Sequence, residues 1–130
     1  MAALVAALTP MTASATECRD PFEFGVPVVE GRVLSVRQVE RRVPFWGVDI
    51  WQADVATLRI LAGKSAPKRF KYIAIDREGP CNWGFIIPKV GDVFAFPLYE
   101  DEWGKTPRTY STNTAVTVAR YRRAHAWPPN

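Results

Sequence analysis

Cys18 and Cys81 are the residues of this chain whose types and spacing could support covalent chemistry. Cys18 follows an apolar segment, residues 1–15, that ends in the small residues Ala13-Ser14-Ala15, as a secretion signal and its cleavage site do. Cleavage there would send residues 16–130 to an oxidising compartment, secreted or periplasmic, where two cysteines are expected to pair. The disulfide would close a loop of about 60 residues and stabilise the fold by roughly 4 kcal/mol.

Two alternatives stay open for these segments. No lysine or arginine precedes the apolar core of residues 1–15, so this segment could instead be an ordinary buried part of the domain. Cys18 and Cys81 would then be two buried, unlinked thiols of a cytosolic protein. In either case residues 1–15 are shorter than the about 20 apolar residues that span a bilayer, so we expect no membrane span.

Other candidates for catalytic or metal-binding chemistry are few. His125 is the only histidine and lies in the tail, a poor place for the base of a nucleophilic enzyme. Glu100, Asp101 and Glu102 form a run that is typical of a solvated hairpin tip, not of the paired acids of a glycosidase. Two cysteines and one histidine are too few for a structural zinc site. We therefore expect no catalytic residues, no metal and no cofactor.

Composition favours a single binding domain. The chain of 130 residues contains five Trp, seven Phe and four Tyr, and its net charge of +4 favours acidic partners. This mild basicity is weaker than the basic stripe of a dedicated nucleic-acid binder, so we do not expect nucleic acid as a partner.

An apolar turn is the first candidate for a binding surface. Phe45 and Trp46 lie between Pro44 and Gly47, and apolar residues at a loop tip are more informative than those in strands. They could form an exposed contact loop, or they could fold back over an open end of the domain. Asn82 and Trp83 could extend the contact surface beside Cys81, or they could pack over the disulfide.

A basic face is the second candidate. Arg41 and Arg42 precede the Phe45-Trp46 turn, and basic residues next to aromatic ones are used by small β-barrels to bind polymers. The alternative is that these charges are only solvated. The other members of the predicted face are Lys64, Lys68, Arg69 and Lys71.

Short runs rich in Val, Ile, Phe, Tyr and Thr, separated by Gly and Pro, predict that β-strands position these candidates. The apolar alternation slips at Val33-Leu34 and again between Val55 and Leu58, which predicts a β-bulge at each place. Residues 81–89 could hold a short helical turn. Long, bulged first and second strands favour a five-stranded Greek-key barrel of the oligonucleotide/oligosaccharide-binding (OB) type. The predicted strands are residues 28–43, 48–61, 70–75, 93–99 and 109–118, followed by a basic tail.

The order of these features resembles the netrin-like module, whose best-known members are the tissue inhibitors of metalloproteinases. The resemblance rests on Val29-Glu30-Gly31-Arg32-Val33, on the turn after Leu58 that ends in Gly63-Lys64, on Cys81-Asn82-Trp83-Gly84, and on the strand that follows Val90-Gly91-Asp92. It covers residue 18 to about residue 122. It implies an OB-type barrel over residues 16–130, a first cysteine linked to Cys81, and recognition of a protein, with a metalloproteinase as one candidate.

This chain departs from those inhibitors in two ways. It can form one disulfide where they have several. Cleavage after Ala15 would leave Thr16 and Glu17 ahead of Cys18, so the Cys18 nitrogen would be an amide and a poor zinc ligand. We therefore expect a non-catalytic module that recognises a protein in an inhibitor-like manner. The alternative is binding of an anionic polysaccharide or another envelope polymer.

Overall fold

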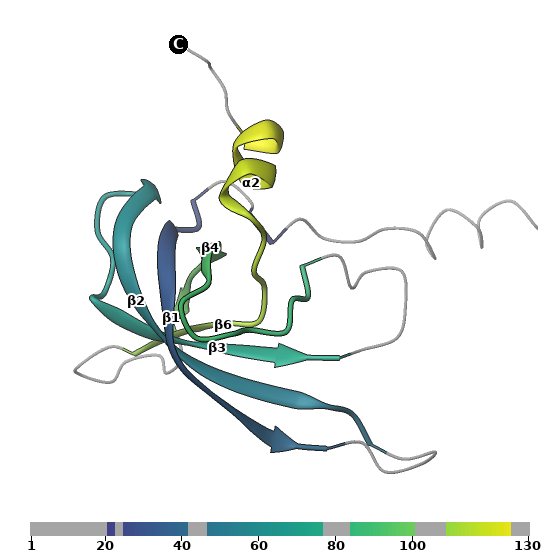
Figure 1. Cartoon of the computed structure of the whole chain (residues 1–130). Helices are drawn as coiled ribbons and strands as arrows, with labels where there is room; N and C mark the ends of the chain where they lie inside the picture. Colours follow the sequence, from purple (N-terminus) through teal and green to yellow (C-terminus); the bar gives the residue numbers. More distant parts are fainter. Residues whose placement is uncertain (1–20, 23–24, 42–46, 77–83, 101–108, 126–130) are drawn as a thin grey trace, which may run out of the picture.

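The computed structural model describes residues 21–22, 25–41, 47–76, 84–100 and 109–125. They form six β-strands and one short helix (Figure 1). The elements are β1 (Val28–Glu40), β2 (Ile50–Ala62), β3 (Arg69–Ile75), β4 (Val93–Pro97), β5 (Tyr99–Glu100), β6 (Tyr110–Thr112) and α2 (Val118–His125).

The strands form a single sheet that curls into a barrel. Their order is β4-β1-β2-β3-β6-β5, and every pair is antiparallel except β3 with β6. The two strands at the ends of this order, β4 and β5, are separated in the chain only by Leu98. One continuous segment therefore joins both edges of the sheet, which is the connectivity of an OB-type barrel.

This arrangement confirms the predicted fold class and corrects the strand count from five to six. The predicted strand at residues 93–99 is interrupted at Leu98, whose backbone N–H donates to the carbonyl of Pro27 at 2.9 Å. Leu98 is also buried in the core. The segment pairs with β1 before this residue and with β6 after it.

Both predicted bulges are present in the β1–β2 ladder. Leu34 is skipped between the pairs Val33–Val55 and Ser35–Asp54. Leu58 is skipped between the pairs that β1 makes with Thr57 and Arg59. Each bulge shifts the alternation of side chains by one residue, so the inward and outward sets change parity along the same strand.

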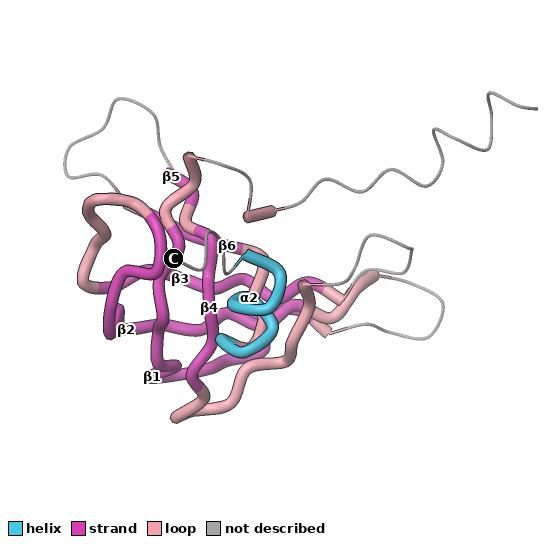
Figure 2. Tube along the Cα trace, turned by 90° about the horizontal axis from the view of Figure 1, so that it is seen from above, coloured by secondary structure: helices cyan, strands magenta, loops and turns pink. Residues whose placement is uncertain are grey.

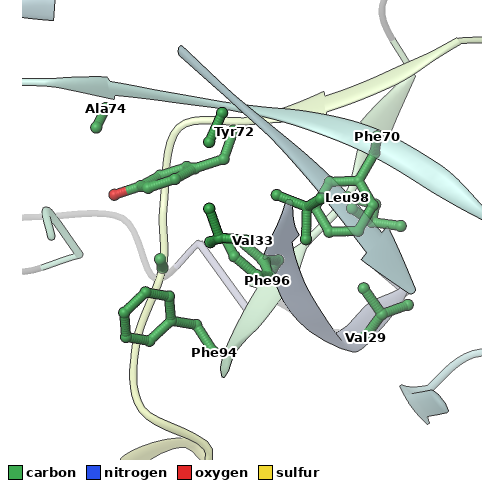
Figure 3. Close-up of a cluster of buried hydrophobic side chains, with 11 residues drawn as sticks. Val29, Val33, Phe70, Tyr72, Ala74, Phe94, Phe96 and Leu98 are labelled. Atoms are coloured by element: carbon green, nitrogen blue, oxygen red, sulfur yellow. The ribbon is translucent and has the colours of Figure 1, made fainter. Parts of the chain in front are cut away.

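Aromatic rings fill the barrel interior (Figure 3). Phe96 lies at the centre, with its ring centroid 5.1 Å from that of Phe70, 5.4 Å from that of Tyr72 and 6.0 Å from that of Phe94, all in edge-on geometry. Such pairs stabilise a core beyond the area they bury. Gly31 opens the space for these rings, since a Cβ there would lie 2.6 Å from Val55 Cγ1.

Tyr72 ties the interior to the loop that precedes β4. Its hydroxyl donates to the carbonyl of Ile86 at 2.7 Å and accepts from the Ile86 N–H at 3.1 Å. Burial raises the pKa of Tyr72 to about 12, although the hydrogen bond to the Ile86 backbone lowers it. Tyr72 is therefore a neutral structural donor at physiological pH. Residues 84–89 of the predicted 81–89 segment form a turn and an extended loop without a helix.

A second apolar cluster lies outside the barrel, under α2. Figure 2 shows α2 lying over β4. Thr117 caps the helix, because its Oγ1 accepts from the Arg120 N–H at 3.1 Å. Tyr121 packs on Phe22 with 5.2 Å between ring centroids.

The predicted C-terminal strand is shorter than expected, and the predicted tail is a helix. The strand expected at residues 109–118 is only Tyr110–Thr112, followed by an isolated bridge between Val116 and Ala95. The residues expected as a basic tail belong to α2.

Candidate binding face on the outer sheet

Most of the predicted site residues lie outside the described residues. This holds for both cysteines and for most of the predicted aromatic and basic contacts, so the disulfide and the contact loop stay predictions. The residues concerned are Cys18, Arg42, Phe45, Trp46, Cys81, Asn82 and Trp83. Arg41 is described and is exposed directly after β1.

Within the described part of the chain, no group of three or more His, Cys, Asp or Glu side chains could hold a metal ion. His125 has a packing role, because its ring stacks on Tyr121 with centroids 4.8 Å apart and an interplanar angle of 18°. Its Nδ1 lies 3.2 Å from the Tyr121 carbonyl oxygen. Of the acidic run, Glu100 ends β5, while Asp101 and Glu102 are not among the described residues.

The outer surface of β1, β2 and β3 carries the largest group of basic side chains that the described residues bring together. On these strands the residues that alternate with the buried ones face outward. The bulges at Leu34 and Leu58 keep Arg32, Arg37 and Arg59 on the same side of the ladder. We call this surface the basic sheet face, and its cationic members are Arg32, Arg37, Arg59, Arg69 and Lys71.

The strand register arranges these residues in rows. Arg32 on β1 and Arg69 on β3 both pair with Ala56, so they flank a small side chain. Because neighbouring strands lie about 4.8 Å apart, the Cα atoms of the two arginines are separated by roughly 10 Å. Lys71 lies in the next row, about 7 Å further along β3.

Three carboxylates also lie on this face, and they leave it positively charged. Glu30 forms an ion pair with Arg59, with 2.7 Å between Oε1 and Nε. Asp54 accepts a hydrogen bond from Ser35 Oγ at 3.0 Å and is paired across the strands with Lys71. Glu40 lies at the far end of the face, opposite Ile50 on β2. Five cations and three anions leave a net charge of +2 on the face.

Four of the cations keep their hydrogen-bonding capacity for a ligand. The side chains of Arg32, Arg37, Arg69 and Lys71 are exposed, and none forms an ion pair with a described residue. In water an exposed charge interacts weakly with any single partner, so a face of this kind acts through several contacts at once.

Aromatic side chains do not contribute to this face. At the outward positions of β1, β2 and β3, as far as the structure describes them, there is no Phe, Tyr or Trp. Phe70 and Tyr72 point into the barrel. Trp51 packs against the core and lies 6.0 Å from Phe85 between ring centroids. The face therefore offers charge and hydrogen bonds without a stacking platform.

The predicted basic face and the observed one overlap in part. Arg69 and Lys71 belong to both. Arg41 and Lys64, in contrast, follow opposite ends of the β1–β2 hairpin, which a 13-residue strand separates by on the order of 40 Å. The sequence prediction missed Arg32, Arg37 and Arg59, although alternation counted across the two bulges would have placed them together.

Neither the family models, nor the curated proteins, nor the solved structures compared with this chain give a match. Among the described residues, no helix is long and apolar enough to cross a membrane.

Proposed function

We propose that this protein is a non-catalytic binding module that holds an anionic polymer on the basic sheet face. The observation that carries the proposal is the cluster of four exposed cations, Arg32, Arg37, Arg69 and Lys71, that lack an acidic partner among the described residues. A polyanion can contact several of them together, and it releases its condensed counterions when it does. Many weak contacts then add up to useful affinity.

The absence of aromatic side chains from the described part of this face selects among polyanions. Barrels that bind single-stranded nucleic acids stack the bases on aromatic rings, with about 1–3 kcal/mol per base. Here the aromatic residues of the same strands form the core. A polymer without bases, such as an anionic polysaccharide or another envelope polymer, is the better match. The proposed export of the chain would bring it to such polymers.

The test is binding of the full chain to heparin fragments over a range of salt concentrations. We expect affinity to fall steeply as salt rises. Arg32→Ala with Arg69→Ala should weaken binding at low salt by roughly 10- to 30-fold. The matched control, Arg41→Ala with Lys64→Ala, removes the same charge at the two ends of the hairpin and should change binding much less. Equal losses in both double variants would contradict a localised face.

Recognition of a protein is a second candidate, and the shape of the β1–β2 hairpin favours it. Pairing between these strands continues to Glu40–Ile50, well past the last β1–β4 pair at Arg32–Val93. The connection that contains Phe45 and Trp46 is thus attached to an arm that extends beyond β4 (Figure 1). Phe45→Ala with Trp46→Ala should abolish salt-insensitive capture of a protein partner and leave the melting temperature unchanged. A large drop in melting temperature would show that these rings belong to the core.

The netrin-like relationship, with export and the Cys18–Cys81 disulfide, is part of the same proposal. The OB-type connectivity supports it, since a barrel of this kind is what the resemblance implies. The test is the intact mass of the protein from its native host under non-reducing conditions. A chain that begins at Thr16 and is two hydrogens lighter than the dithiol is expected. An uncleaved chain with free thiols would contradict the proposal, and a chain that begins at Cys18 would restore zinc chelation by its terminal amine.

A further inference from the structure

Asp54 occupies the centre of the basic sheet face. On β2 it is paired with Ser35 on one side and Lys71 on the other. The row on one side of Asp54 contains Arg32 and Arg69. The row on its other side contains Arg37 on β1. This exposed carboxylate therefore has cations beside it on both neighbouring strands, β1 and β3.

Asp54 is an unusual group to find at the middle of a site for polyanions. An ionised carboxylate only accepts hydrogen bonds, and it has about four lone-pair positions. Ser35 Oγ donates to one of its oxygens, Oδ2, at 3.0 Å. A ligand made only of phosphate groups presents acceptors alone, so it would be repelled at this point. A ligand that has both anionic groups and hydroxyls can satisfy the arginines and the carboxylate together.

We infer that the polymer is an acidic polysaccharide, whose anionic groups bind the arginines while its hydroxyls donate to Asp54. This inference rests on the proposed function and names the ligand class for the same face. Arginine presents a planar fork that pairs with sulfate or carboxylate groups in a bidentate manner. Gln52, next to Asp54 on this side of β2 and paired with Arg37, adds an amide that can donate to and accept from a sugar.

Glu30 provides the internal comparison that makes the inference testable. It is another carboxylate of the basic sheet face, but it already forms an ion pair with Arg59, with 2.7 Å between Oε1 and Nε. Removing the charge of Glu30 and removing that of Asp54 should have the same long-range effect on a polyanion. The two substitutions should differ in two contacts: Glu30→Gln also frees the Arg59 guanidinium for any polyanion, whereas Asp54→Asn removes an acceptor for a ligand hydroxyl.

The experiment compares heparin fragments with polyphosphate of matched charge, using the full chain and the variants Asp54→Asn and Glu30→Gln. The wild-type chain should prefer heparin. Asp54→Asn should weaken heparin binding by roughly three- to tenfold, since a charge-assisted hydrogen bond is lost. The same variant should strengthen polyphosphate binding by about three- to fivefold, because a repulsion is removed. Glu30→Gln should strengthen binding of both polymers.

Three outcomes would overturn the inference or the proposal beneath it. If Asp54→Asn strengthens binding of both polymers as Glu30→Gln does, Asp54 makes no hydrogen bond to the ligand and the polysaccharide inference fails. If the wild-type chain prefers polyphosphate, the inference also fails, and the basic sheet face remains an anion site. If the wild-type chain binds neither polymer, the proposed function itself fails. Melting curves of the variants should match the wild type, because both carboxylates lie on the barrel surface.

Discussion

The inner and outer surfaces of β1, β2 and β3 are formed by alternating residues of the same three strands, yet they have opposite chemistry. The inner surface contains Phe70, Tyr72, the partly buried Trp51 and small or branched aliphatic residues, and the rings of Phe70 and Tyr72 pack on Phe96. The outer surface has five cations and not one aromatic residue among the described positions. We therefore expect that a substitution in the core leaves the proposed ligand contacts unchanged, and that a substitution on the outer surface leaves the core unchanged.

The largest effect is expected for Phe96→Ala. Phe96 is fully buried and contacts three other rings, so its removal leaves a cavity at the centre of the barrel. We expect the free energy of unfolding to fall by about 3–5 kcal/mol. Urea denaturation measures this loss. Heparin binding by the fraction that stays folded should be unchanged, and a proportional loss of affinity would show that the two surfaces are not independent.

Gly31→Val tests whether the space beside Gly31 is needed by the core side chains of Val55 and Phe70. The first added carbon would lie 2.6 Å from Val55 Cγ1 and 3.1 Å from Phe70 Cζ. We expect a loss of stability near the upper end of the ~1–3 kcal/mol that overpacking costs. Combining it with Val55→Ala should recover part of that loss in a double-mutant cycle. Additive losses would mean that the clash with Val55 is not the cause.

Ionisation of Tyr72 should lower the free energy of unfolding in alkali. In the unfolded chain its hydroxyl ionises near pH 10, whereas burial raises the pKa in the folded protein to about 12. Between these values the unfolded state has lost a proton that the folded state retains. The free energy of unfolding is therefore unaffected below pH 10 and falls as pH rises toward 12, by on the order of 2 kcal/mol. Denaturation curves at pH 9 and pH 12 measure the fall.

Tyr72→Phe is the control for this titration. It removes the ionising group, so the alkaline fall attributed to Tyr72 should disappear. At neutral pH it should cost about 1–3 kcal/mol, because the Ile86 N–H and carbonyl lose their partner. An unchanged alkaline slope would assign the fall to other groups.

The smallest effect on stability is expected on the outer surface. Arg32→Ala with Arg69→Ala removes two exposed side chains that make no ion pair with a described residue. We expect the free energy of unfolding to stay within about 0.5 kcal/mol of the wild type. A loss of several kcal/mol would show that these arginines hold the sheet together, and the separation of the two surfaces would then be wrong.

The sequence predicted the features that depend on local alternation. The strands β1 to β4 and the bulges at Leu34 and Leu58 follow from a period of two and from its slips, and the long, bulged first and second strands favoured the barrel. These signals are strong because a one-residue change of register would turn apolar side chains toward water.

The sequence did not predict features that depend on distant partners. The helix α2 has only Val118 and Tyr121 as its packed apolar residues, and Tyr121 contacts Phe22, which is about 100 positions away in the chain. Without that contact the run around Arg122 is typical of a solvated tail. The basic face predicted from the sequence was incomplete for the same reason. Arg32 and Arg69 become neighbours only because each of them pairs with Ala56 on β2.

The most direct test of the proposed binding site is to map a short heparin oligosaccharide onto the protein by amide chemical-shift perturbation in NMR. We expect little change at Phe96 and on α2, and the largest shifts at Arg32, Ser35, Asp54, Ala56, Arg69 and Lys71. Shifts confined to residues 41–47 or to α2 would place the ligand elsewhere. That result would contradict the claim that the outer surface of β1, β2 and β3 is the binding site.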